Sequence, residues 1–303
     1  MLLTGLDWTV VALYGAMVLV VGVWFTRRAG TDAESYFLAG RSLPWWILGT
    51  SMVATTFSTD TPNLVTDIVR TGGVAGNWTW WAFALTGMLT VFFYARLWRR
   101  SGVLTDVEFY ELRYSGREAA FLRGFQALYL GVLFNVMVMA SVTLAAIKIG
   151  GVLLGISPVT VVVVMASLTL VYSATSGLWG VVATDLLLFV VAMIGAVAAA
   201  VVAVNHPDVG GLAALVSDPA VTGSLDFFPD FADRKNAIAV FIVPIAVQWW
   251  SIWYPGAEPG GGGYLAQRML AARSEDHALK AVLWFNVAHY GVRPWPWILV
   301  ALA

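Results

Sequence analysis

Hydroxyl and acidic side chains interrupt an apolar stretch of the chain at residues 45–69. Thr56 and Ser58 are followed by Asp60 in the middle of this stretch. Each polar group left unsatisfied in hydrocarbon costs several kcal/mol, so the sequence predicts that a membrane helix breaks at residues 54–59. Carbonyl groups freed by such a break suit a hard cation such as sodium. The alternative is a proline-kinked helix whose hydroxyls bond back to its own carbonyls.

Polar and charged side chains continue beyond this point along one face of the predicted helix. Asn63, Asp67 and Arg70 follow Asp60 at spacings of three, seven and ten residues, which places all four on one side of a helix. A stripe of this kind indicates a protein interior or a water-filled path. A position in the outer headgroup region explains Asp67 and Arg70 equally well, but this explanation is weaker for Asp60.

A buried cation is predicted near the end of the chain. Arg293 lies about 13 residues beyond Lys280, or roughly 20 Å into a crossing of about 30 Å. An arginine at that depth costs at least about 2.5–3.5 kcal/mol in lipid, so its side chain should face the protein. His289 and Asn286 lie four and seven residues earlier, on the same helical face.

The elements that carry these groups must be membrane helices. The chain has 303 residues, of which 59% are hydrophobic and 12% charged, with a mean hydropathy of +0.78. A water-soluble globule carries about 25% charged residues, so that class of protein is excluded. The net charge of −1 gives no basic surface for nucleic acid, and the absence of cysteine excludes disulfides and thiolate chemistry.

Eight apolar stretches are long enough to cross the hydrocarbon core of a bilayer. We therefore predict an all-α integral membrane protein with a single transmembrane domain over residues 1–303. The last stretch ends without a polar flank, which predicts that the chain is the N-terminal part of a longer protein. The expected spans are residues 8–25, 45–69, 78–98, 119–147, 158–173, 178–204, 237–254 and 279–303.

Basic residues gather on one side of the expected spans. Eleven follow the first, third and seventh stretches, whereas four lie near the opposite ends. Because Lys and Arg are retained on the cytoplasmic side, we expect a multi-pass protein of the plasma membrane with its N-terminus outside. The eleven are Arg27, Arg28, Arg41, Arg96, Arg99, Arg100, Arg113, Arg117, Arg268, Arg273 and Lys280.

Four motifs resemble those of the sodium/solute symporter family, which contains sodium-coupled sugar, proline, pantothenate and iodide carriers. They are YFLAGRSLPWW at residues 36–46, DVEFYELRY at 106–114, GLW and TD within 177–185, and QRMLAARS at 267–274. They occur in the order expected for the family. The resemblance implies a LeuT-like inverted-repeat transporter bundle in which the first apolar stretch is an additional helix. It also implies that the bundle is truncated, with the last core helices outside this chain.

The same resemblance implies Na⁺ as the coupling ion. By position, the family's sodium-binding backbone carbonyls correspond to those of Ala54 and Phe57. The remaining oxygen ligands are expected from a core helix that this chain lacks. Asp185 is implied to belong to the inner exit path for sodium. The alternative is that Asp185 is an ordinary carboxylate near the start of a helix.

Side chains near the expected break are the candidates for binding a solute. Sugar carriers of the family place a carboxylate and an amide near positions held here by Thr79 and residues 262–263, so the resemblance does not favour a sugar. One interpretation makes Arg293 the anchor for an anionic group of the solute. The alternatives are a permanent ion pair with one of the two aspartates of the second span, or a position at the outer interface. For Ser58 and Asp60, the alternative is that they act on the sodium ion rather than on the solute. The full set is Ser58, Asp60, Thr61, Asn63, Thr79, Tyr264, His289 and Arg293.

We therefore expect a secondary active transporter, in which sodium flow drives uptake of a small polar organic solute by alternating access. Its expected partners are sodium, the solute and the lipid bilayer, with no nucleic acid, and no residue is assigned a catalytic role. Three alternatives remain open. They are a polytopic membrane enzyme built on Asp60, His289 and Arg293, a channel, and a symporter domain fused to a signalling module.

Overall fold

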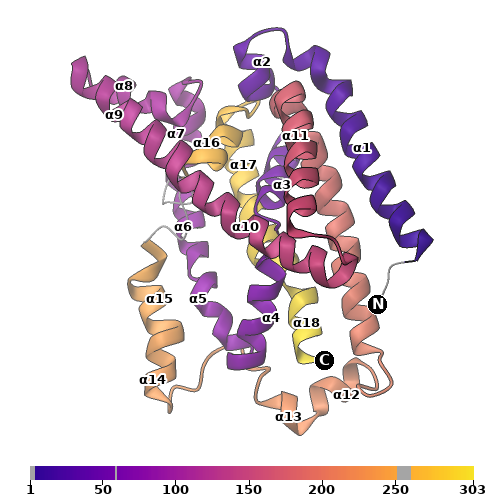
Figure 1. The fold of residues 1–303 in the computed structure, drawn as a ribbon. Coiled ribbons are helices and arrows are strands. Elements are labelled where there is room, and N and C mark those ends of the chain that lie inside the picture. Colours follow the sequence, from indigo (N-terminus) through magenta and orange to yellow (C-terminus); the bar gives the residue numbers. More distant parts are fainter. Residues whose placement is uncertain (1–3, 59, 251–260) are drawn as a thin grey trace.

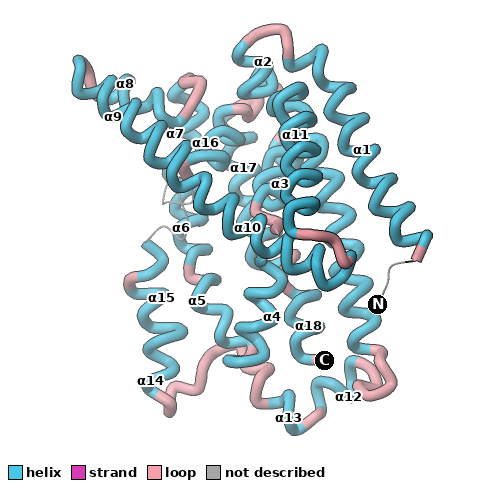
Figure 2. Tube along the Cα trace, in the orientation of Figure 1, coloured by secondary structure: helices cyan, strands magenta, loops and turns pink. Residues whose placement is uncertain are grey.

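The computed structural model describes residues 4–58, 60–250 and 261–303. Figure 2 shows that helices and loops make up this part of the chain, and it contains no β-strand. The predicted all-α class is confirmed. Part of the seventh expected span, residues 251–254, lies outside the described residues, whereas residues 262–263 are described.

The first helix, α1 (Gly5–Ala29), has charges that suit both of its ends. Thr4 and Asp7 form a capping box at its start, while Arg27 and Arg28 lie in its last turn, so the signs of the charges match the helix dipole. Four helical segments among the described residues are long and apolar enough to cross a membrane. They are Gly5–Ala29, Val74–Ser101, Gly116–Leu154 and Pro158–Val204.

The second expected span is divided into two helices, as the polar cluster predicts. α3 (Trp45–Thr55) ends in the middle of the bundle, and α4 (Asp60–Gly72) starts after a short break. At the end of α3 the amide of Phe57 donates to the carbonyl of Ala54 at 2.8 Å. The interruption predicted at residues 54–59 is therefore present, with Thr59 outside the described residues.

The middle of the chain consists of two long helical runs that contain π-helical turns. The first run is η2 (Val74–Asn77), α5 (Trp78–Trp81), α6 (Phe83–Leu89), η3 (Thr90–Tyr94) and α7 (Ala95–Ser101). The second is α9 (Gly116–Leu128), η5 (Tyr129–Phe134), α10 (Asn135–Ile149) and η6 (Gly150–Leu154), reached through η4 (Asp106–Glu108) and α8 (Phe109–Arg113).

Short helices follow in the last part of the described chain. The segment after the sixth expected span holds α12 (Leu212–Ser217) and α13 (Pro219–Thr222). It is followed by α14 (Arg234–Ala237), η7 (Ile238–Ile242), α15 (Val243–Ala246) and η8 (Gln248–Trp250). The final elements are α16 (Gly263–Leu270), α17 (Glu275–Asn286), η9 (Val287–Val292) and α18 (Trp295–Leu302).

Helix α11 (Pro158–Val204) folds back on itself at Gly177. The backbone there has φ 53° and ψ −156°, a conformation that L side chains rarely adopt. A Cβ at this position would also lie 2.6 Å from the carbonyl oxygen of Tyr36. Figure 1 shows one limb rising to α2 (Ala33–Leu38) and the other descending to α12. The two limbs correspond to the expected spans 158–173 and 178–204.

Helices α2, α8 and α16 lie at one end of the bundle (Figure 1). Basic residues lie in the last turns of α1, α7 and α8. Arg96 pairs with Asp276 and Arg100 with Glu275, both at 2.8 Å. The hydrogen bond from Arg100 holds the pKa of the exposed Glu275 carboxyl below its usual value. These pairs join the end of α7 to the first turn of α17, where acidic groups also favour the helix dipole.

The core forms where α3 packs against α16 and α17. Its buried side chains include Leu48, Met52, Met269 and Val282. Gly49 permits the closest approach in this contact, because a Cβ there would lie 2.5 Å from the carbonyl oxygen of Ala281. The broken helix therefore packs backbone against backbone on α17.

Replacing Gly49 by alanine tests this contact. The added methyl group meets backbone, which cannot move aside, so α3 and α17 must separate, and we expect a loss of about 1–3 kcal/mol or more in the free energy of unfolding. Thermal unfolding of the detergent-purified protein measures the loss. Gly15→Ala is the matched control, because a Cβ there meets nothing within 4 Å. Equal stability of the two variants would contradict the close approach.

Candidate functional site

The break between α3 and α4 is held by a buried arginine. Nη1 of Arg293 donates to the carbonyl oxygen and to the hydroxyl of Thr56, both at 2.9 Å. The whole Arg293 residue is only 2% exposed, which confirms that it faces the protein. Among the ion pairs of the described residues, none joins Arg293 to Asp60 or Asp67. The guanidinium therefore caps a carbonyl that the break has released.

His289 completes this network. Its Nε2 lies 3.3 Å from Nη2 of Arg293, and its Nδ1 lies 3.2 Å from the Thr56 hydroxyl oxygen. A guanidinium can only donate, so Nε2 must accept and the ring proton must sit on Nδ1. The Thr56 hydroxyl in turn donates to the carbonyl of Val53 at 2.7 Å. The histidine is thus neutral in this arrangement, with its tautomer assigned from its partners.

A cavity of about 320 Å³ lies beside this network, within the range typical of small-molecule sites. It contains charged, polar and aromatic groups. Its wall includes Arg293, whose Nε has no hydrogen-bond partner among the described residues. We call it the outer cavity. It is lined by Asp60, Thr61, Leu64, Val65, Ile68, Thr79, Trp80, Phe83, Gln248, His289, Tyr290 and Arg293.

Aromatic rings form one wall of the outer cavity. Trp80 stacks on Tyr290 with ring centroids 5.6 Å apart and meets the His289 ring edge-on at 5.9 Å. The indole nitrogen of Trp80 donates to the side-chain oxygen of Asn77 at 2.9 Å, which fixes the orientation of the ring. The wall therefore offers a rigid apolar surface next to charged groups.

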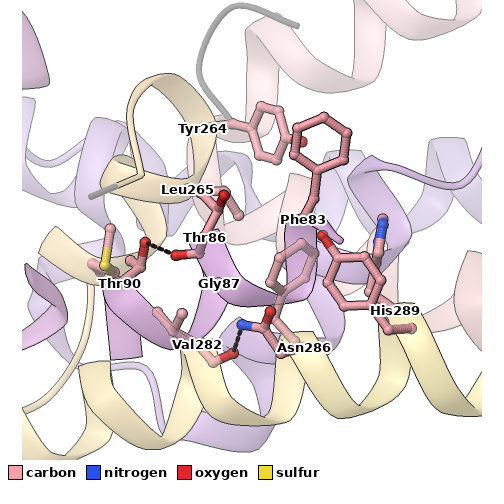
Figure 3. Close-up of a pocket in the computed structure, with 12 residues that line it drawn as sticks. Phe83, Thr86, Gly87, Thr90, Tyr264, Leu265, Val282, Asn286 and His289 are labelled. Carbon is pink, nitrogen blue, oxygen red and sulfur yellow. Dashed lines mark hydrogen bonds between the residues drawn. The ribbon is translucent and has the colours of Figure 1, made fainter. Parts of the chain in front are cut away.

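A second, smaller cavity continues toward the basic end of the bundle. We call it the inner cavity; it measures about 30 Å³, room for only a few water molecules. Phe83, His289 and Tyr290 line both cavities and separate them. Figure 3 shows the inner cavity with Thr86, Thr90, Tyr264 and Asn286 around it.

Asn286 places a buried amide group in the wall of the inner cavity. Its amide nitrogen donates to the carbonyl of Val282 at 2.8 Å, as the dashed line in Figure 3 marks. Its Oδ1 is buried and has no partner in the described part of the chain. A Cβ on Gly87 would lie 1.7 Å from this oxygen, so the position of the amide requires glycine there. The cavity therefore presents one acceptor that lacks a donor.

Asp185 lies on the descending limb of α11, in a buried cluster next to α3. Its Oδ2 accepts from the Ser51 hydroxyl at 2.5 Å and from the Thr55 hydroxyl at 3.3 Å. It also forms an ion pair with Arg268 at 3.3 Å. Arg268 itself is 3% exposed. The cluster thus joins three elements, α3, α11 and α16, within about one turn of the break.

The structure brings only some of the predicted solute residues together. Asp60, Thr61, Thr79, His289 and Arg293 line the outer cavity, and Tyr264 lines the inner one. Ser58 lies beside the outer cavity and donates to the Asp60 carboxylate.

Asn63 lies apart from this group. It lines a separate cavity with Thr66 and Arg70, against Trp297 of α18. The expected stripe on α4 is therefore divided. Asp60 lines the outer cavity and Arg70 lines the same cavity as Asn63, whereas Asp67 is exposed and lines neither.

Arg268 was expected only as one of the basic residues that follow the seventh span, and the structure shows it in a buried cluster. It is a buried residue on α16, between the core positions Leu265 and Met269. Its position between two apolar residues at helical spacing could have indicated that Arg268 is buried. Gln248, which donates to the carbonyl of Thr79 at 3.1 Å, was also missed because no local pattern connects two residues so far apart in sequence.

The described residues contain no group of three or more His, Asp or Glu side chains that could hold a metal ion. A sodium ion needs no such group, because backbone and hydroxyl oxygens suffice as ligands. Ala54 is buried at the end of α3, and Phe57 follows in the break. Their carbonyls therefore lie where the helix stops.

The family profile of the "Sodium:solute symporter family" matches residues 36–288. The chain belongs to this family. The match covers the motifs on which the resemblance rested and confirms it.

Curated relatives of this symporter-family chain are transporters rather than enzymes. A "Sodium/glucose cotransporter" from Vibrio parahaemolyticus is 29% identical over 289 residues, which is 93% of this chain and 52% of the relative. The "Sodium/sialic acid symporter" of Proteus mirabilis is 28% identical over 190 residues, 60% of this chain and 36% of the relative. The chain thus spans about half the length of the first of these relatives.

A solved structure supports the fold of this family member. It is described as the substrate-bound outward-open state of a Na⁺-coupled sialic acid symporter, and it superposes with a TM-score of 0.72 at 21% identity. The alignment covers 99% of this chain and 60% of that one. The expected LeuT-like fold is confirmed.

Arg293→Gln tests the clamp at the break. Glutamine cannot supply the charged donors that Thr56 and His289 accept from, so we expect the free energy of unfolding to fall by about 2–4 kcal/mol. The stability of Arg293→Lys should lie between those of Arg293→Gln and the wild type, because an ammonium group replaces the several donors of the guanidinium only in part. Thermal unfolding measures both.

Arg117→Gln, at an exposed position, is the control for charge removal. A stability of Arg293→Gln equal to that of this control would show that the break does not depend on the guanidinium.

Proposed function

We propose that the full-length protein is a sodium-coupled symporter that carries a small polar organic solute. The observation that carries this proposal is the outer cavity, which opens directly beside the break between α3 and α4. Broken helices with a site beside the break are the usual device of transporters with this architecture. The relatives, which are sodium-coupled carriers by name, support the same conclusion.

Sodium is proposed to bind at the end of α3, through the carbonyl oxygens of Ala54 and Phe57. The C-terminus of a helix carries partial negative charge, which favours a cation there. Asp185 is proposed to receive sodium on the inner exit path, because its carboxylate lies about one turn from the break. One sodium ion moving down 100 mV supplies about 2.3 kcal/mol, besides its concentration gradient.

The solute is proposed to bind in the outer cavity. Asp60, Thr61, Thr79 and His289 offer polar contacts, with Ser58 supporting the Asp60 carboxylate. The free Nε of Arg293 is proposed to donate to an anionic group of the solute. A sugar is not favoured as the solute, because Thr79 stands near the position where sugar carriers of the family have a carboxylate.

Release is proposed to proceed through the inner cavity. In this conformation the outer cavity has room for a solute and the inner one does not, and Phe83, His289 and Tyr290 stand between them. Alternating access then requires these rings to move while the inner cavity widens toward Tyr264. Asn63 is proposed to lie on an accessory aqueous path, since it lines another cavity.

The protein is proposed to lie in the plasma membrane with its basic end in the cytoplasm. That end carries α2, α8 and α16, so the N-terminus of α1 would face the outside. The exposed apolar side chains of α1, α10 and α11 are proposed to contact lipid; they include Val20, Trp24, Val136 and Val163.

Uptake into proteoliposomes tests sodium coupling. Full-length protein should accumulate a labelled solute, found from a panel of amino acids, organic acids and sugars, when sodium is present outside. Replacing sodium with choline at equal ionic strength should reduce the initial rate at least tenfold, because choline is too large for the carbonyl site. An uptake rate that does not change with this replacement would refute the proposal.

Asp185→Asn tests the exit carboxylate. The variant should require several times more sodium for half-maximal uptake, and its solute affinity should fall mainly at low sodium, because the two bindings are linked. Asp208→Asn, in an exposed loop, is the control. A sodium dependence like that of the wild type in a correctly inserted variant would remove Asp185 from the sodium path.

A further inference from the structure

Arg268 occupies a position that a cation would otherwise take. Its Nε donates to the Ser51 hydroxyl at 3.2 Å, and its Nη2 lies 3.1 Å from the Thr55 hydroxyl and 3.3 Å from Asp185 Oδ2. These three oxygens come from two separate elements, α3 and α11. A guanidinium from a third element, α16, therefore fills the pocket that they form.

Two hydroxyls and a carboxylate are ligands that sodium also accepts, because it is a hard cation with a preference for oxygen. Sodium and the guanidinium compete for the cluster, because both bind the same oxygens of Ser51, Thr55 and Asp185 and two positive charges in one buried pocket repel each other. An empty cluster would leave a buried carboxylate without a counter-ion, which is strongly unfavourable. While Asp185 is ionised, it therefore needs one of these two cations beside it.

We propose that Arg268 is an internal counter-ion that exchanges with sodium at Asp185. Sodium moving inward displaces the guanidinium, and the guanidinium returns when sodium leaves for the cytoplasm. This inference rests on the sodium coupling proposed above, and it assigns to Arg268 a role in the release step.

The guanidinium has partners on its own helix for the displaced state. Nη1 already lies 2.9 Å from the side-chain oxygen of Gln267 and 3.5 Å from the carbonyl of Tyr264. The guanidinium carbon also lies 5.8 Å from the centre of the Tyr264 ring, a distance at which cation–π attraction acts. Displacement therefore moves Arg268 from a contact between elements to contacts within α16.

The exchange connects sodium release to the inner cavity. Arg268 ties α16 to α3 and α11, and Tyr264, one turn earlier on α16, lines the inner cavity. When sodium displaces the guanidinium, this tie is lost on the side from which solute and sodium must depart. A sodium ion at Asp185 thereby loosens the element that narrows the release path.

Sodium binding to purified full-length protein tests the exchange without transport. Tryptophan fluorescence is followed as sodium chloride replaces choline chloride at constant ionic strength, with no solute present. Arg268→Gln removes the competing cation, so half-saturation should occur at a sodium concentration roughly fivefold or more below that of the wild type. Arg273→Gln, an exposed arginine near the end of α16, is the matched control and should leave it unchanged.

A chemical competitor gives a second measurement. In Arg268→Ala, free guanidinium at millimolar concentration should re-enter the cluster and raise the sodium concentration needed for half-saturation. The same guanidinium should have little effect on the wild type, whose cluster already holds the side chain. This measurement also covers the case in which Arg268→Gln does not fold, because guanidinium added during purification supplies the missing charge.

Each result decides between two roles for Arg268. A sodium requirement that is unchanged or higher in Arg268→Gln, together with no guanidinium effect in Arg268→Ala, would overturn the exchange and leave a purely structural ion pair. A wild-type protein that shows no response to sodium would instead refute sodium coupling itself. A wild type that responds, with variants that do not differ from it, refutes the exchange alone.

Discussion

A helix that stops inside a membrane leaves carbonyl groups that water cannot reach, and the rest of this chain is arranged around that defect. The carbonyl of Thr56 is satisfied by Arg293, which is held in turn by His289. This requirement explains why a charged side chain lies deep in the last helical segment. It also explains why the outer cavity lies where it does, because the same break that needs a donor also separates α3 from α4.

Two buried arginines approach the last turns of α3 from different elements. Arg268 contacts the hydroxyls of Ser51 and Thr55, while Arg293 contacts Thr56 just beyond the end of the helix. The negative end of the helix dipole favours both. Sodium is proposed to bind at the same helix end. The C-terminus of α3 therefore attracts cations. The two arginine side chains and the proposed sodium ion all balance its partial negative charge.

Apolar stretches and polar interruptions predicted the helices, the break and the inward orientation of Arg293, because burial in hydrocarbon penalises polar groups in a way that a local pattern reveals. Pairing between distant residues was not predictable. Nothing in the sequence near Asp185 indicates that Arg268 lies 3.3 Å away, and Arg268 was expected only among the basic residues after the seventh span. Likewise, Asp60 and Asn63 share a helix face by spacing, but the packing of α18 places them beside different cavities.

The turn at Gly177 joins the two limbs of α11 without a connecting loop, and this restricts how the molecule can move. The turn packs against Tyr36 and Ala29, and Asp185 lies little more than two helical turns beyond it. Because no flexible loop connects the two limbs, the limb after Gly177 can tilt about this turn but cannot slide along its own axis. The carboxylate is therefore the stationary half of the ion pair at the inner end, and the guanidinium on the short helix α16 is the half that travels.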